Sequence, residues 1–219
     1  MRNKDYSYLY ENWDDTVRRR KVTLSNPVFM KGLALAPVVV AGTSVHNGIL
    51  LCIAVFLLLT PTRVITSLIT RHMSVPFKTF FYPFVSAIIF AFVYYYMYTL
   101  FGSRVLMLGV YLPILVIDPL IVKNFEKTRK ESFLYSIING LRNTMGFAVA
   151  CMLVCAVREF LAFGTLAGVK VIGTSLLPMA QYSFGGFLIV ALMAGVWSAA
   201  VRNYKYRVEV EALHNERHS

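Results

Sequence analysis

Charged residues are scarce in this chain of 219 residues. Asp, Glu, Lys and Arg make up 15 % of it, whereas hydrophobic residues make up 57 %. This composition excludes an ordinary soluble domain and indicates that the solvent is lipid. Acidic residues are outnumbered 11 to 22 by Lys and Arg, which gives a formal net charge of +11. Because the basic residues lie between apolar runs and form no stripe on a soluble face, they indicate membrane topology and argue against nucleic-acid binding.

Cysteine is also sparse, and the common catalytic motifs are missing. Cys52, Cys151 and Cys155 lie in apolar stretches without the paired spacing of a disulfide framework. Cys151 and Cys155 share one helix face and could present two thiolates to a metal ion, but a buried cysteine usually acts as a small hydrophobic residue. The sequence has no glycine-rich nucleotide loop, zinc motif or nucleophile elbow. It therefore predicts no catalytic residue, no metal site and no cofactor.

Long apolar runs are what the chain has in abundance. A hydrocarbon core about 30 Å thick needs roughly 20 residues of helix, and helices are required because lipid offers the backbone no hydrogen-bond partners. Six runs are long enough: 27–45, 48–69, 79–101, 104–122, 143–163 and 183–202. We expect an N-terminal segment at 1–25, a six-helix membrane domain at 26–202 and a tail at 203–219.

The basic residues predict the orientation of these helices. Most of them fall in the two end segments and in every second connection, whereas the remaining connections hold only Arg104 and Lys170. Lys and Arg accumulate on the cytoplasmic side, so both ends of the chain are predicted to be cytoplasmic. Arg63, near the inner end of the second run, is expected to extend its charge to the inner interface.

Two of the six runs contain residues that interrupt a helix. Proline removes an amide donor and clashes with the preceding turn. The interruptions include Pro27, Gly32 and Pro37 in the first run and Gly109, Pro113 and Pro119 in the fourth. Interrupted segments at matching places in two halves are typical of an inverted repeat with a site near the middle of the membrane. We therefore predict an all-α membrane fold of six transmembrane helices, arranged as two inverted three-helix repeats with interrupted first and fourth helices.

Asp118 is the candidate ion or proton site. An ionisable group within a membrane helix is costly and normally faces a cavity, a partner or the bundle interior. Two other roles remain open for it. Asp118 could accept hydrogen bonds where Pro113 and Pro119 disturb the helix, or it could pair with Lys123 near the inner surface.

Arg158 and Glu159 end the fifth run, shortly before Gly164. Opposite charges at this position could neutralise each other or cap the end of their helix at the outer surface. We favour capping over a catalytic pair, because no nucleophile or metal-ligand pattern accompanies them.

Four short motifs, in order and at matching spacing, carry a family resemblance. They are Leu33–Pro37, Leu112–Pro119, Arg158-Glu159 with Gly164–Leu166, and Gly185–Phe187. With these motifs the chain resembles the six-helix membrane subunits of the Rnf and sodium-pumping Nqr electron-transport complexes, and most closely the Rnf E and Nqr D subunit. The likeness runs along most of residues 26–202.

The resemblance implies a cofactor that this chain lacks the residues to hold. In the family, one cysteine from each broken helix helps to ligate an iron–sulfur cluster between paired sister subunits, and such clusters need thiolates. The matching positions here are Ala36 and Pro119. Neither side chain can ligate iron, so the family's cluster is expected to be lost from this chain.

The resemblance also implies partners and a location. It points to an integral subunit of an Rnf/Nqr-type ion-translocating electron-transport complex in a bacterial inner membrane, paired with a sister subunit and other complex subunits. A divergent, cluster-free relative would act as scaffold or ion path, and at most as a non-catalytic subunit of a membrane oxidoreductase. The alternatives are a stand-alone inverted-repeat transporter that moves a small solute or ion around Asp118, and a purely structural membrane partner.

Overall fold

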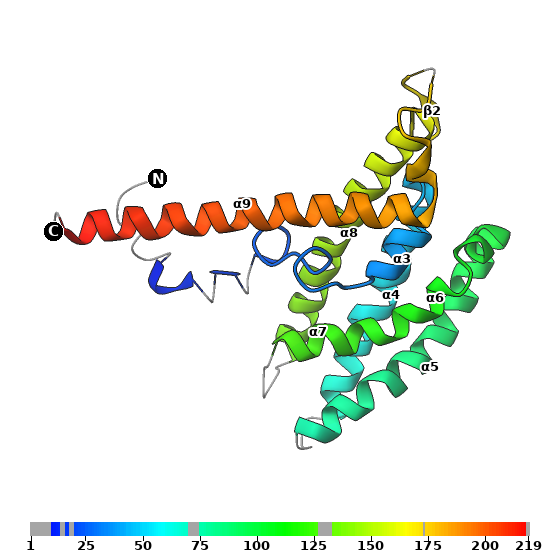
Figure 1. The fold of residues 1–219 in the computed structure, drawn as a ribbon. Helices are drawn as coiled ribbons and strands as arrows, with labels where there is room; N and C mark the ends of the chain where they lie inside the picture. The colour runs from blue at the N-terminus through cyan, green and yellow to red at the C-terminus, as the bar shows by residue number, and fades with distance from the viewer. Residues whose placement is uncertain are drawn as a thin grey trace.

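The computed structural model describes residues 10–13, 16, 17, 20–69, 75–126, 133–172 and 174–217. Residues 1–9 of the predicted N-terminal segment lie outside this described part. The chain is largely helical (Figure 1). Its elements are α3 (Leu35–Val40), α4 (Val45–Ile69), α5 (Val75–Phe101), η1 (Gly102–Leu108), α6 (Tyr111–Ile114), η2 (Leu115–Ile117), α7 (Asp118–Glu126), α8 (Phe133–Phe163), β1 (Thr165–Leu166), β2 (Val169–Lys170), η3 (Pro178–Gln181) and α9 (Ser183–Arg217).

Four helices in the described part are long and apolar enough to cross a membrane. They are Val45–Ile69, Phe80–Leu108, Phe133–Phe163 and Ser183–His214. The prediction of an all-α, multi-pass membrane protein is therefore confirmed. The predicted count of six crossing helices is not confirmed, because the first and fourth runs do not form continuous helices.

The first predicted run, 27–45, is interrupted more completely than the sequence suggested. Its α-helical part is α3, six residues long. Gly32 and Ala34 precede it with φ angles of 69° and 49°, a left-handed conformation that terminates a helix. The residues before α3 form a series of turns, so this segment contributes a half-helix instead of a full crossing.

The fourth predicted run, 104–122, is also broken. It begins as the 3₁₀ helix η1, stops at Gly109, where φ is 52°, and continues as a short apolar helix over Tyr111–Val122. Within that helix the three residues of η2 are again 3₁₀. Both interruptions therefore fall in the two runs where the sequence predicted them.

α4 and α8 form the centre of the bundle as an antiparallel pair (Figure 1). Gly48 lies against Cys155 near one end of the pair, and Gly140 lies against Thr60 farther along. Half of the apolar window in each helix is buried, compared with 22 % in α5 and α9. α4 and α8 are therefore interior helices, and α5 and α9 flank them with large apolar surfaces that lipid or another membrane protein can cover.

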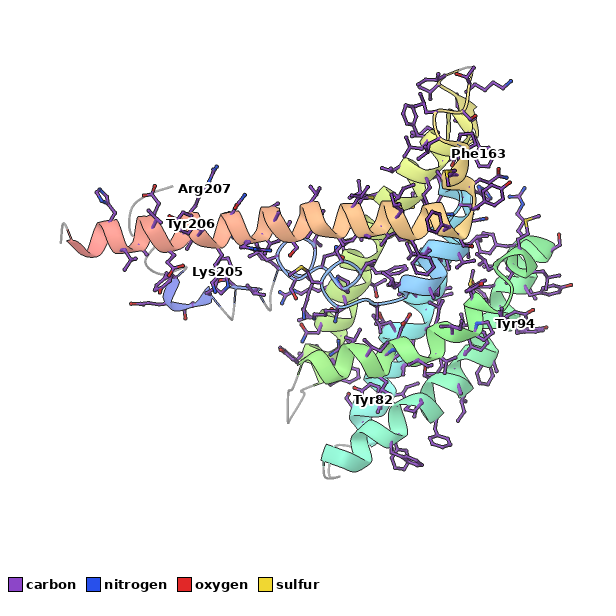
Figure 2. All side chains as sticks on the ribbon, viewed as in Figure 1. Tyr82, Tyr94, Phe163, Lys205, Tyr206 and Arg207 are labelled. Atoms are coloured by element: carbon purple, nitrogen blue, oxygen red, sulfur yellow. The ribbon has the colours of Figure 1, made fainter. Side chains whose placement is uncertain are left out.

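α9 leaves the bundle and extends away from α4 and α8 (Figure 1). Its first turns contact η3, α3 and α8. Farther along, the rings of Trp197 and Phe29 lie 5.3 Å apart and those of Tyr204 and Trp13 lie 6.1 Å apart. Figure 2 labels Lys205 on the projecting part of α9, where most side chains are exposed but Val208 and Ala212 are buried.

Candidate site between the interrupted segments

Asp118 joins the two interrupted segments. It begins α7, is 4 % exposed, and accepts a hydrogen bond at Oδ1 from the backbone N–H of Ala34 at 3.1 Å. Ala34 is the residue that caps the start of α3, where backbone N–H groups have no partner within the helix. A carboxylate at this position satisfies one such donor and interacts favourably with the helix dipole. The expectation that Asp118 accepts a hydrogen bond at a disturbed helix matches this contact.

The second oxygen of Asp118, Oδ2, is buried and has no hydrogen-bond partner among the described residues. Asp118 lines a narrow hollow whose other walls are apolar: Val55, Leu58, Leu59, Leu115 and Pro119. The hollow has no room for a water molecule. A buried polar atom without a partner is energetically costly. The predicted pairing with Lys123 concerns a side chain that lies outside the described part.

The two positions that the resemblance matches to the family's cysteines lie at the contact between the start of α3 and the start of α7, which we call the joint. Ala36 is in the first turn of α3, two residues after Ala34, and Pro119 follows Asp118 at the start of α7. Neither side chain carries a donor atom for iron. Among the described residues, no group of three or more His, Cys, Asp or Glu side chains is arranged to hold a metal ion. The donor set at the joint therefore does not fit an iron–sulfur cluster held by this chain.

Arg158 is fully buried near the end of α8 and binds the ends of two short helices. Its guanidinium donates to the carbonyl oxygens of Val39 and Gly42, at and just after the end of α3, and to the carbonyl oxygen of Ala180 in η3. Carbonyl groups at a helix end lack partners and carry the negative end of the helix dipole. A guanidinium with five donors suits such a cluster of acceptors.

Glu159, the next residue, binds a helix start. Its Oε2 accepts a hydrogen bond from the N–H of Val45, the first residue of α4, at 2.7 Å. Its Oε1 accepts from the N–H of Gly168 at 2.8 Å and from the hydroxyl of Thr165 at 3.1 Å, in the β1–β2 hairpin. The sequence favoured capping of the end of their own helix, α8, whereas the contacts observed for Arg158 and Glu159 are with the ends of other helices and with the β1–β2 hairpin. Two consecutive residues of α8 hold the end of α3 and the start of α4.

Glycine allows the close approach that this arrangement needs. A Cβ at Gly186, in the first turn of α9, would lie 2.8 Å from both Arg158 Cζ and the carbonyl oxygen of Val39. A real Cβ atom does not come that close to another heavy atom, so a larger residue would displace the guanidinium or α9. Gly186, one of the two glycines in the fourth motif, is thus explained by the packing of α9 on Arg158.

The three thiols gather at the contact between α4 and α8. Cys151 Sγ lies 3.9 Å from Cys155 Sγ and 3.9 Å from the carbonyl oxygen of Gly48. Cys52 Sγ lies 4.0 Å from the carbonyl oxygen of Ala148. A Cβ at Gly48 would be only 2.8 Å from Cys155 Sγ. The thiols fill space against glycine in a close helix contact, which is the small-residue packing typical of membrane helices.

A group of buried polar residues was missed by sequence reasoning. Arg63 is fully buried, so the expectation that its charge reaches the inner interface is wrong. Thr62, Thr66, Ser136, Asn139 and Asn143 are buried too, and the antiparallel register places them on the facing halves of α4 and α8. The spacing could have revealed them, because Ser136, Asn139 and Asn143 recur at three and four residues and share one helix face.

The fold and the joint define a class: a largely helical, multi-pass membrane protein in which two interrupted segments meet at a buried carboxylate. The family model described as "Rnf-Nqr subunit, membrane protein" matches residues 16–196. This chain belongs to that family, and the resemblance carried by the four motifs is confirmed.

Curated relatives share the family. The chain is 24 % identical over 181 residues to the E subunit of the proton-translocating ferredoxin:NAD(+) oxidoreductase complex of Clostridium ljungdahlii, covering 81 % of this chain and 85 % of the relative. It is 27 % identical over 181 residues to the E subunit of the ion-translocating oxidoreductase complex of Methanosarcina acetivorans, covering 80 % and 85 %. Identity to the E subunit of the ion-translocating oxidoreductase complex of Haemophilus influenzae is 28 % over 147 residues, covering 65 % of this chain and 61 % of that relative.

Proposed function

We propose that this chain is an integral membrane subunit of an Rnf/Nqr-type ion-translocating electron-transport complex. The observation that carries the proposal is the family match over residues 16–196, together with relatives named as the E subunit of such complexes. The exposed apolar surfaces of α5 and α9 support it, since a sister subunit needs a membrane-embedded face to contact.

The proposed membrane domain, 26–202, is a six-element inverted repeat with both chain ends, 1–25 and 203–219, in the cytoplasm of a bacterial cell. The element order supports it, because each half has one interrupted segment followed by two long helices. Corresponding elements also meet across the centre: α4 pairs with α8, and the start of α3 meets the start of α7 at the Ala34–Asp118 hydrogen bond. In transporters built as inverted repeats, the functional site lies at the interface between the two repeats.

Within the complex we assign this chain the role of scaffold or ion path, and not that of an electron carrier. Ala36 and Pro119 offer no iron ligand at the joint. Asp118 offers a buried carboxylate with one unused oxygen, which is the chemistry expected of a proton or cation site in a membrane.

Co-purification tests membership of a complex. The chain is affinity-tagged in its own host, extracted in a mild detergent and analysed with its partners by mass spectrometry. We expect at least one further Rnf/Nqr-type membrane subunit in stoichiometric amount. Purification of the chain alone, with no such subunit, would contradict the proposal.

Asp118→Asn tests the ion path. Asparagine keeps an oxygen for the Ala34 N–H and nearly the same shape, but it removes the ionisable group. We expect the variant to assemble normally and to lose ion translocation by the intact complex. Asp118→Leu is the comparison variant, because it removes both the ionisable group and the hydrogen-bond acceptor. It should lower the free energy of unfolding by about 1–3 kcal/mol. Normal ion translocation by Asp118→Asn would leave the scaffold role and eliminate the ion path.

A stand-alone transporter is the alternative function, and the same unpartnered oxygen of Asp118 favours it. The protein alone would then take up a solute or ion into liposomes, and Asp118→Asn would abolish the uptake. Absence of uptake across a broad panel of solutes and ions would count against this function.

A further inference from the structure

An open groove lies between the N-terminal segment and the first half of α8. Its described lining consists of Arg20, Lys21, Val22 and Thr23 on one side and Leu141, Arg142 and Met145 on the other. The groove offers about 380 Å³, within the range of about 300–1,000 Å³ typical of ligand sites. These lining residues include three cations and no acid.

The wall formed by the N-terminal segment is held firmly in place. Asn26 donates from Nδ2 to the carbonyl oxygen of Gly146 at 2.9 Å and accepts at Oδ1 from the N–H of Val28 at 2.9 Å. A Cβ at Gly146 would lie 2.7 Å from the carbonyl oxygen of Lys21, so glycine permits this close approach. From α9, Trp197 donates to the carbonyl oxygen of Thr23 at 2.9 Å. The groove is therefore built by contacts to two helices.

The charges in the groove suit a phosphate group. Arg20 and Arg142 are exposed, and among the described residues neither side chain has a hydrogen-bond or ion-pair partner. Lys21, 4 % exposed, adds a third positive charge to the lining. A guanidinium binds phosphate oxygens through paired N–H donors, and here two of them flank one space.

The apolar wall suits an acyl chain. Leu141 is 44 % exposed and Met145 is 63 % exposed. They lie four residues apart on one face of α8. A free phosphate ion would satisfy the cations but would leave this wall uncovered.

We propose that this groove binds one anionic phospholipid, with its phosphate at Arg20 and Arg142 and an acyl chain along Leu141 and Met145. Basic pockets between membrane helices recognise anionic headgroups by this combination of charge and apolar surface. The site is independent of the joint at Asp118 and of the identity of any partner subunit.

Native mass spectrometry of the full chain tests the proposal. The detergent-purified protein is incubated with phosphatidylglycerol, with phosphatidylcholine of the same acyl chains, or with phosphatidylglycerol plus millimolar inorganic phosphate. The groove variant is Arg20→Gln with Arg142→Gln. The control variant is Arg202→Gln with Lys205→Gln, which removes two exposed charges from α9. A third variant, Arg20→Lys with Arg142→Lys, keeps the charge of the groove.

The expected result is one bound phosphatidylglycerol that survives inorganic phosphate, and weaker binding of phosphatidylcholine. The groove variant should bind roughly thirtyfold more weakly, because two cations that face the headgroup are lost. The control and lysine variants should retain the lipid. The proposal is overturned by retention of the lipid in the groove variant, by equal loss in the control variant, or by displacement with inorganic phosphate.

Discussion

Replacing Arg158 by methionine should destabilise the protein strongly, because this side chain holds the ends of two short helices. The shortest hydrogen bonds of the guanidinium go to the three carbonyl oxygens of Val39, Gly42 and Ala180, and two longer ones of 3.5 Å go to those of Gln181 and Tyr182. Methionine fills similar space but leaves all three acceptors without this donor in a region that excludes water. Each buried polar group left unpaired costs about 1–3 kcal/mol, so we expect a total loss of roughly 3–5 kcal/mol. For a chain of this size that loss lowers Tm on the order of 10 °C.

The buried thiols supply the assay. Cys151 and Cys155 are fully buried, so a maleimide dye that fluoresces on reaction with thiols reports the unfolding of the detergent-solubilised protein. Arg158→Lys should give an intermediate Tm, because an ammonium group keeps the charge but has fewer donors and a shorter reach. Arg202→Met, at an exposed position of α9, should change stability by no more than about 0.5 kcal/mol. If Arg158→Met unfolds at the same Tm as Arg202→Met, the contacts of Arg158 with the helix ends do not stabilise the fold and the reasoning fails.

Three further predictions concern residues close to Arg158. Gly186→Ala should cost about 1–3 kcal/mol because its Cβ meets Arg158, whereas Gly195→Ala, with open space around it, should be neutral or stabilising in the same thermal assay. Glu159→Gln should cost about 1–2 kcal/mol, since an amide retains one acceptor oxygen where the carboxylate uses two; a larger loss in thermal unfolding would show that the charge itself matters. Cys155→Ser should leave the iron content of anaerobically purified protein unchanged, and stoichiometric iron that disappears with this change would show that the thiols hold a metal.

The sequence predicted the membrane class and the location of both interruptions, because these depend on local chemistry. Apolar runs of about 20 residues specify helices in lipid, and Gly32 and Gly109 adopt the positive φ angles at which the two runs are interrupted. The sequence did not predict how short α3 would be. Its limits depend on the left-handed conformation of Ala34 and on carbonyl contacts to Arg158 from far along the chain. Neither is visible in the local pattern.

The sequence likewise predicted only part of the candidate site. Asp118 was found because a carboxylate inside an apolar run is conspicuous. Its partner Ala34 was not, since a backbone N–H carries no signal in the sequence and lies 84 residues away. Arg63 was placed at the interface because only its distance from the end of the run could be judged. Its burial depends on the facing surface of α8, which the sequence of α4 does not reveal.

Interrupted helices in lipid need substitutes for the water that would cap them in a soluble protein. In this fold those substitutes are ionisable side chains of the matching sign: Arg158 at the end of α3, Glu159 at the start of α4, and Asp118 at the start of α3. Arg158 and Glu159 each make several hydrogen bonds, so a purely structural role explains both residues. Asp118 uses one oxygen and keeps the other buried without a partner among the described residues. The hydrogen bond from Ala34 needs only one acceptor oxygen, which an asparagine side chain would also supply, so the ionisable group at Asp118 is where a function beyond capping is expected.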